Sequence, residues 1–198
     1  MCLKRPMETN RTMVTDAEAR ALKARDGRPW TLRPARPTDS PGLSRLVADV
    51  RREGRWLVTP PSAVSQPSEA FFIGEMIRGE DGLALVAEAD GEAIGNVLIT
   101  IERNVVSRHV GTLSIVVAEA WRDVGVGSAM VRAAQAWTRQ QGLAKLALGV
   151  FPDNARAIAV YEHAGFRREG VRRRQYRAPS GFRDELLMAW FPDEEPEP

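Results

Sequence analysis

The sequence predicts an α+β fold in α/β/α layers, with helices on both faces of a mixed, mostly antiparallel sheet of about seven strands. Two apolar runs meet at Asp90-Gly91, a dipeptide typical of tight β-hairpins. In the second half of the chain, short apolar runs alternate with segments of helical period. The chain has 198 residues, of which 43% are hydrophobic, enough to bury one core.

The expected elements follow in chain order. Residues 1–28 are polar and mixed in charge, so we expect a mobile extension in which residues 15–24 could form one marginal helix. One domain is expected over residues 29–191, followed by an acidic, proline-rich disordered tail over residues 192–198. The periodicity predicts strands at 30–35, 83–89, 92–101, 110–117, 145–150, 166–177 and 183–191, and helices at 39–51, 68–78, 125–141 and from Asn154 to Gly165.

Residues 113–130 are the most informative stretch. An apolar strand breaks and turns into a helix through Arg122-Asp123-Val124-Gly125-Val126-Gly127. A helix that begins in this way leaves several N–H groups unpaired at the positive end of its dipole, which favours a phosphate. The alternative is a simple tight turn. A P-loop lacks its Lys-Ser/Thr here, and a dinucleotide fingerprint lacks its third glycine and acidic residue.

A second segment strengthens the functional interpretation. The short strand 145–150 is followed by a Pro152-Asp153 break and then by a helix that starts at Asn154. Ala157 and Tyr161 are four residues apart and share one face of that helix.

These two segments resemble the motifs of the GNAT superfamily of N-acetyltransferases. Arg122-x-x-Gly125-x-Gly127 is similar to the acyl-CoA signature, and Asn154-x-x-Ala157-x-x-x-Tyr161-x-x-x-Gly165-Phe166 is similar to the second motif, in the same order and spacing. The resemblance covers roughly residues 30–191. Residues 30–35 and 184–188 also look like small bacterial acetyltransferases of uncertain substrate.

The resemblance implies a GNAT fold with acetyl-CoA as cofactor. Its fourth and fifth strands, 113–117 and 145–150, would splay apart and admit the pantetheine. Tyr161 would be the general acid that protonates the leaving thiolate, since a thiol pKa of about 8.5 and a phenol pKa of about 10 are close. The cofactor-binding residues implied are Val116, Val117, Arg122, Asp123, Val124, Gly125, Val126, Gly127, Ser128, Asn154, Ala157 and Tyr161.

The acceptor side is less defined. Trp56, Phe71, Phe72 and Ser114 are the candidate substrate-binding residues, and core packing is the alternative for the two phenylalanines. Some relatives carry a glutamate base on the strand that enters the first motif, where this chain has Gly111, Thr112 and Ser114. Glu75 and Glu102 could relay a proton through water or be solvated surface acids.

The expected function is direct acetyl transfer from acetyl-CoA to a primary amine, on a small molecule or a peptide, in a ternary complex. Cys2 lies in the expected extension, where it is poorly placed to carry an acyl group. One alternative is an acyl-CoA-binding module without catalysis. Another is an RNA-associated protein that uses the basic strand 167–177, but a net charge of +2 does not favour nucleic acid as a partner.

Composition narrows the remaining classes. A single cysteine excludes an intramolecular disulfide, and with only His109 and His163 as histidines no metal site is expected. The start lacks the apolar core of a signal peptide and no segment reads as a membrane span, so we expect a cytoplasmic protein without membrane contact. Pairing into a homodimer is compatible with the family, and the identity of the acceptor amine stays open.

Overall fold

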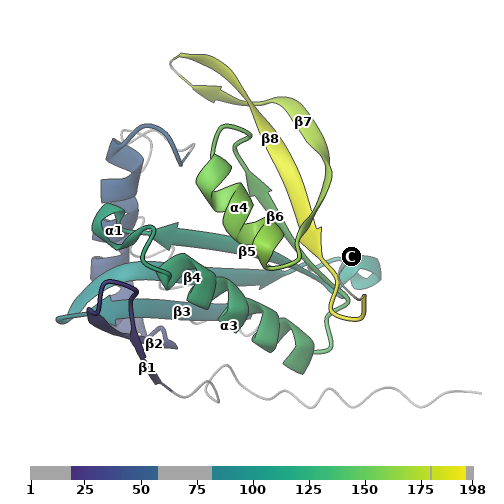
Figure 1. Cartoon of the computed structure of the whole chain (residues 1–198). Coiled ribbons are helices and arrows are strands. Elements are labelled where there is room, and N and C mark those ends of the chain that lie inside the picture. The colour runs from purple at the N-terminus through teal and green to yellow at the C-terminus, as the bar shows by residue number, and fades with distance from the viewer. Residues whose placement is uncertain (1–18, 58–81, 179, 195–198) are drawn as a thin grey trace, which may run out of the picture.

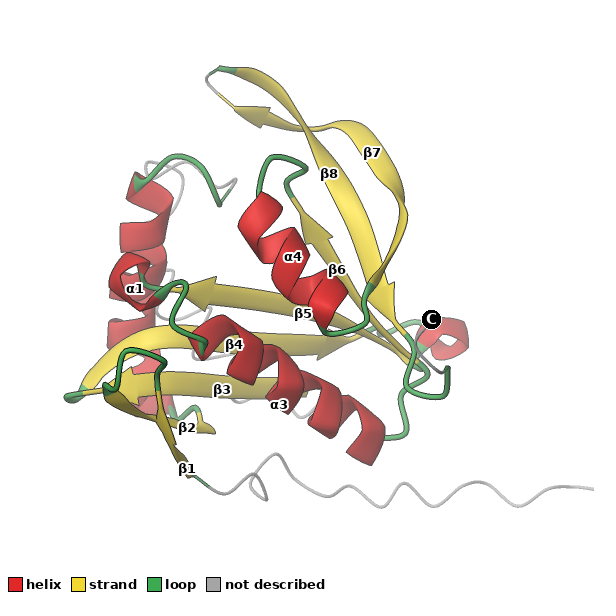
Figure 2. Cartoon of the chain, in the orientation of Figure 1, coloured by secondary structure: helices red, strands yellow, loops and turns green. Residues whose placement is uncertain are grey.

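The computed structural model describes residues 19–57, 82–178 and 180–194. They form one eight-stranded sheet in the order β1-β2-β3-β4-β5-β6-β8-β7. Helix α1 covers one face of the sheet, and α3 and α4 cover the other (Figures 1 and 2). The α+β fold with helices on both faces is confirmed, with eight strands rather than about seven. The bounds are β1 Arg20–Lys23, β2 Pro29–Pro34, α1 Ser40–Arg52, β3 Gly82–Ala89, β4 Glu92–Ile101, β5 Val110–Val117, α3 Val126–Gln140, β6 Lys145–Val150, α4 Ala155–His163, β7 Arg167–Ala178 and β8 Gly181–Trp190.

The first strand differs from the expectation for residues 1–28. Residues 20–28 form neither a helix nor an extension, because β1 pairs antiparallel with β2 and a turn at Gly27, with φ of +92°, joins the two strands. Non-local contacts hold this hairpin in place: the Arg28 guanidinium lies 3.8 Å from the Trp121 ring centroid and donates to the Ala120 carbonyl at 2.7 Å. The amide of Arg25 donates to the Val124 carbonyl at 2.9 Å. Such contacts leave no local pattern in the sequence.

The sheet is buried on both faces, which explains the nearly unbroken apolar run of β3. Leu43, Leu46 and Val50 of α1 pack on Val86 and Val116, as the helical spacing predicts. On the opposite face α3 buries four side chains in the main core: Val126, Met130, Val131 and Ala134. The two helix layers therefore fix the sheet from both sides.

The predicted splay between the fourth and fifth strands is confirmed at β5 and β6. These parallel strands pair only over 110–112 and 145–147. Beyond that point β5 continues beside β4, whereas β6 continues beside β8. The two strands therefore diverge toward their carboxyl ends and open a wedge in the sheet.

Two further observations concern the described parts of the chain. No helix within them is long and apolar enough to cross a membrane. The helix expected at 68–78, with Phe71, Phe72 and Glu75, lies outside the described residues, as does most of the tail expected at 192–198.

Candidate active site

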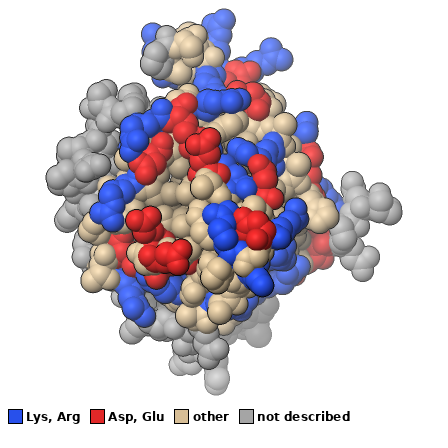
Figure 3. Space-filling model, turned by 60° about the vertical axis from the view of Figure 1, so that its left-hand side comes forward, with Lys and Arg blue, Asp and Glu red and all other residues tan. Residues whose placement is uncertain are grey.

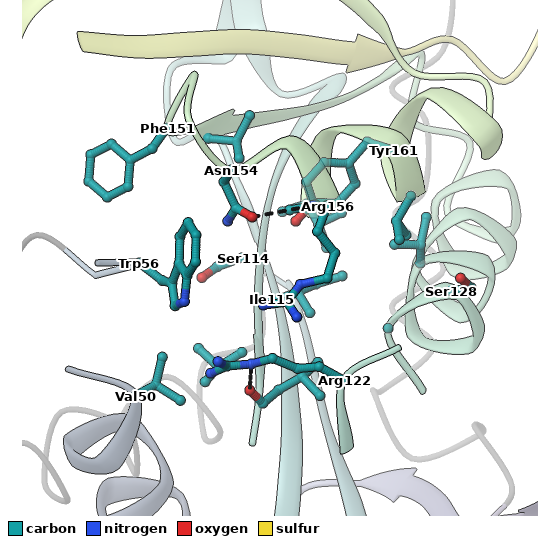
Figure 4. A pocket seen from close by; sticks show the side chains of 18 of the residues that line it. Val50, Trp56, Ser114, Ile115, Arg122, Ser128, Phe151, Asn154, Arg156 and Tyr161 are labelled. Carbon is teal, nitrogen blue, oxygen red and sulfur yellow. Dashed lines mark hydrogen bonds between the residues drawn. The ribbon is translucent and has the colours of Figure 1, made fainter. Parts of the chain in front are cut away.

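A cleft of about 500 Å³ opens in the wedge between β5 and β6. Figure 4 shows Trp56 and Phe151 on one side of it and Ser128 on the other, with Ser114 and Ile115 of β5 between them. We call these two sides the aromatic end and the loop end. Most of the residues implied by the two motifs line this one cleft: Val116, Val117, Arg122, Asp123, Gly125, Gly127, Ser128, Asn154, Ala157 and Tyr161.

The loop end is formed by residues 122–128, which lead into α3. Asp123 and Gly125 both have left-handed backbones, with φ of +62° and +93°, and turn the chain sharply into the helix. The backbone N–H groups of residues 123–128 make no hydrogen bond to other described residues, and the first helical bond runs from the amide of Ala129 to the Gly125 carbonyl at 3.1 Å. Unpaired amides at the positive end of a 15-residue helix make this loop a candidate anion site.

The Arg122 side chain does not contribute to that anion site, because its guanidinium is already occupied. It donates to both carboxylate oxygens of Glu53 at 2.7 and 2.5 Å, and its Nε donates to the Val117 carbonyl at 3.0 Å. Bidentate pairs of this kind are among the stronger polar contacts in proteins. Arg122 therefore ties the end of β5 to the end of α1 and holds the loop in position.

Two other arginines lie at the loop end, one without a partner among the described residues and one paired with an acid. Arg25 lies beside Gly125, and its guanidinium has no partner among the described residues. Arg156 pairs with the Asp123 carboxylate at 2.9 Å across the mouth of the cleft. Arg25 belongs to the segment that was expected to be a mobile extension, so local sequence patterns could not assign it to the site.

The second-motif helix presents its polar residues to the cleft. The Asn154 side chain accepts a hydrogen bond from the Ala157 amide at 3.3 Å and so caps α4 (Figure 4). Tyr161 lies one turn beyond Ala157, and its ring packs on Phe166 with a centroid separation of 5.6 Å. Burial raises the pKa of Tyr161 to about 12, so its hydroxyl is a neutral proton donor at physiological pH.

The remaining sequence-predicted residues fall into three groups. Trp56 and Ser114 line the cleft. Val124 and Val126 do not line it: the Val126 side chain is fully buried in the core, and both residues can offer only backbone to a ligand. Glu102 is exposed beyond the far end of β4 and does not line the cleft, which removes it as a nearby relay.

The aromatic end contains residues that the sequence did not single out. Tyr176 of β7 donates from its hydroxyl to Glu185 Oε1 of β8 at 2.6 Å, and its ring meets Phe151 edge-on at 5.9 Å. Burial, together with the hydrogen bond to Glu185, raises the pKa of Tyr176 to about 12. Arg183 stacks on Phe151 at 3.5 Å and donates to the Arg55 carbonyl at 2.6 Å, which joins this end to the segment after α1.

The charged surface around the cleft is mixed. Figure 3 shows lysine and arginine side chains interspersed with aspartate and glutamate on this face, without one continuous basic field. Several arginines of β7 are also paired, Arg168 with Glu162 and Arg172 with Glu185. The arginine-rich strand therefore offers less free positive charge than its sequence suggests.

Comparison with known proteins relates this geometry to a family. An L-amino acid N-acetyltransferase of Escherichia coli (AaaT) is 33% identical over 64% of this chain and 78% of its own length. A type 1 aminoglycoside N(6')-acetyltransferase of Stenotrophomonas maltophilia is 31% identical over 69% of this chain and 85% of its own length. A Salmonella typhimurium structure solved with its cofactor acetyl-CoA aligns with a TM-score of 0.73 at 18% identity, over 85% of this chain and 97% of that one. Residues 51–166 match the model of the acetyltransferase (GNAT) family, and the chain belongs to that family.

Proposed function

We propose that the protein transfers an acetyl group from acetyl-CoA, the cofactor of its family, to a primary amine in a ternary complex. One observation carries the proposal: four residues of the loop with the unpaired amides (Asp123, Gly125, Gly127 and Ser128), the wedge beside β5 and Tyr161 all line a single cleft. The diphosphate would bind at the loop end. The pantetheine would lie along the free edge of β5 near Val116 and Val117, which would direct the thioester toward the aromatic end.

Tyr161 would protonate the thiolate as the carbon–sulfur bond breaks. Its pKa of about 12 lies above that of a free thiol, so transfer of a whole proton before bond cleavage would be uphill. Burial in the cleft also disfavours the charged thiolate and raises the thiol pKa, so the difference between the two pKa values becomes smaller. Tyr161 would therefore donate in concert with departure of the sulfur.

The acceptor class rests on the relatives. One is named for L-amino acids and another for aminoglycosides, and both names describe acetylation of an amine nitrogen. A small molecule or peptide with a free amine fits the cleft better than a nucleic acid, because the β7 arginines are partly neutralised by acids. Phe71 and Phe72 lie outside the described residues and stay candidates for binding the acceptor.

A free-thiol assay tests the proposal directly. Acetyl-CoA is incubated with the protein and a panel of amino acids, polyamines, aminoglycosides and peptides. We expect thiol release that depends on one class of amine. Tight CoA binding without acceptor-dependent release would instead indicate an acyl-CoA-binding module, and salt-sensitive retention on RNA would support the nucleic-acid alternative.

A further inference from the structure

The aromatic end of the cleft contains a buried carboxylate that the proposed chemistry has not used. Glu185 on β8 is 8% exposed and lines the cleft together with Tyr176 and Phe151. Buried glutamates are rare in proteins unless they are paired or functional. Burying a charged group costs free energy, so the Glu185 carboxylate needs a specific interaction that compensates this cost.

The site is shaped for this side chain. Gly149 of β6 lies directly against the carboxylate: a Cβ at that position would lie 2.1 Å from Oε1 and 2.7 Å from Cδ of Glu185. Only glycine at residue 149 leaves the carboxylate its present place. Gly149 also belongs to the strand that diverges from β5, so Glu185 reaches the wedge itself.

The carboxylate is held by neighbours but keeps free acceptor positions. Oε1 accepts from the Tyr176 hydroxyl at 2.6 Å, and Oε2 accepts from Arg172 at 3.2 Å. A carboxylate has about four lone-pair positions, so two are left for a ligand. The Arg172 side chain is 56% exposed, so solvent screens its ion pair with the Glu185 carboxylate.

The charge distribution along the cleft points to a cationic ligand group at this end. The loop end carries the helix dipole and Arg25, while Arg156 there is paired with Asp123; the acid that lines the aromatic end is Glu185. Through Tyr176 the carboxylate is linked to Phe151, which lies opposite Ser128 in Figure 4. An anionic cofactor and a cationic acceptor would therefore approach from opposite ends and meet near Ser114.

We infer that Glu185, positioned by Tyr176, binds the ammonium group of the acceptor and accepts its proton. The inference rests on the proposed acetyl transfer. The R–NH₃⁺ group gives one proton to the Glu185 carboxylate, and the nitrogen lone pair of R–NH₂ then attacks the thioester carbonyl carbon. The carbon–sulfur bond breaks, and the sulfur takes the Tyr161 proton. The second proton lost by nitrogen restores Tyr161 through water, and Glu185 releases its own proton to solvent, so one proton is released per amide formed.

Glu185→Gln tests the inference with two acceptors. One is an amine that the screen shows to be acetylated. The other is its analogue with a trifluoromethyl group on the amino carbon, which makes the amine mostly uncharged at the assay pH. We expect kcat/KM to fall about 10²-fold for the charged amine and less than about tenfold for the uncharged one, with the KM for acetyl-CoA unchanged.

Two further variants support the interpretation. Asp184→Asn, on the same strand, removes the same charge but keeps an oxygen that can accept from the Arg174 amide, and it should leave both reactions within about twofold. Tyr176→Phe removes the hydroxyl that positions Glu185 and should cost about fivefold with the charged amine alone. This variant also provides a test if Glu185→Gln does not fold, which its thermal midpoint reports.

Equal losses with both acceptors would show a structural role for Glu185, and an unchanged rate with the charged amine would show no role. Either result overturns the inference while acetyl transfer stands. If the wild-type protein releases no thiol with any amine, the proposed function is wrong, and the inference fails with it.

Discussion

The loop end of the cleft presents unpaired backbone N–H groups, whereas the aromatic end presents side chains. At the loop end the amides of residues 123–128 have no partner among the described residues, and the Arg122 side chain braces the turn. At the aromatic end, Trp56, Phe151, Tyr176 and Glu185 come from four separate segments. Backbone amides suit an invariant diphosphate, and side chains suit an acceptor that differs between relatives. The loop end therefore fits one cofactor, whereas the aromatic end fits a class of acceptors.

The largest effect is expected at Tyr161, where the two ends meet. Tyr161→Phe removes the proton donor but keeps the ring on Phe166. We expect turnover to fall about 10²-fold or more, while CoA affinity changes little. Steady-state thiol release and calorimetric CoA binding check this. A variant with the wild-type rate would exclude Tyr161 as the acid.

A smaller effect is expected from the backbone of the loop end. Gly125 has φ of +93°, and alanine there would strain the turn by about 1–3 kcal/mol or force it to rearrange. Gly125→Ala should weaken CoA binding about tenfold by disturbing the convergent amides. Gly142→Ala is the matched control, because Gly142 has φ of +66° and no contacts within 4 Å of an added Cβ. The control should lower thermal stability but not CoA affinity, and equal loss of affinity in both variants would contradict a special role for the loop.

Arg25 tests whether the N-terminal hairpin belongs to the loop end. Arg25→Met removes a guanidinium that lies near the unpaired amides and has no other partner among the described residues. We expect CoA affinity to fall about three- to fivefold, with a weaker dependence on salt. Arg20→Met, on the exposed face of the same hairpin, is the control and should have no effect. The same CoA affinity in Arg25→Met as in the wild type would separate the hairpin from the site.

The smallest effect concerns pH. Burial raises the pKa of Tyr161 to about 12, so kcat at saturating acceptor should show no loss from phenol ionisation between pH 8 and about pH 10.5. A raised folded-state pKa also stabilises the protein below the unfolded value of about 10, and that stability is lost as pH rises from about 10 through 12. A pH–rate profile and denaturation at several pH values check both points. An alkaline limb centred near pH 10 that disappears in Tyr161→Phe would contradict them.

Elements of the fold that depend on local sequence signals were predicted, whereas those that depend on non-local contacts were not. The helix over Ser40–Arg52, the Asp90-Gly91 hairpin and the strand that leads into the 122–128 loop each carry a local signal, namely period, turn residues or glycine spacing. The β1 strand carries none, because it is held by pairing with β2 and by contacts with Ala120 and Trp121. The sequence therefore predicted the architecture but placed residues 20–28 outside it.

The site residues divide in the same way: local spacing indicated some of them, and non-local contacts revealed the others. The spacing of Gly125 and Gly127, and of Asn154 and Tyr161, indicated the segments that line the cleft. The sequence placed Glu185 in a strand but did not indicate that it is buried, because its burial depends on Gly149 of a different strand. Arg122 was expected to offer its backbone N–H to the diphosphate, but that amide donates to the Glu119 carbonyl at 3.2 Å, and its side chain pairs with Glu53, 69 positions away. A buried acid opposite a glycine on a neighbouring strand cannot be recognised before the register is known.

A crystal structure with bound CoA tests the central claim most directly. We expect the diphosphate within hydrogen-bond distance of the amides of residues 125–128, the pantetheine between β5 and β6, and the sulfur next to the Tyr161 hydroxyl. A CoA molecule bound elsewhere, or a wedge closed by continuous β5–β6 pairing, would contradict it.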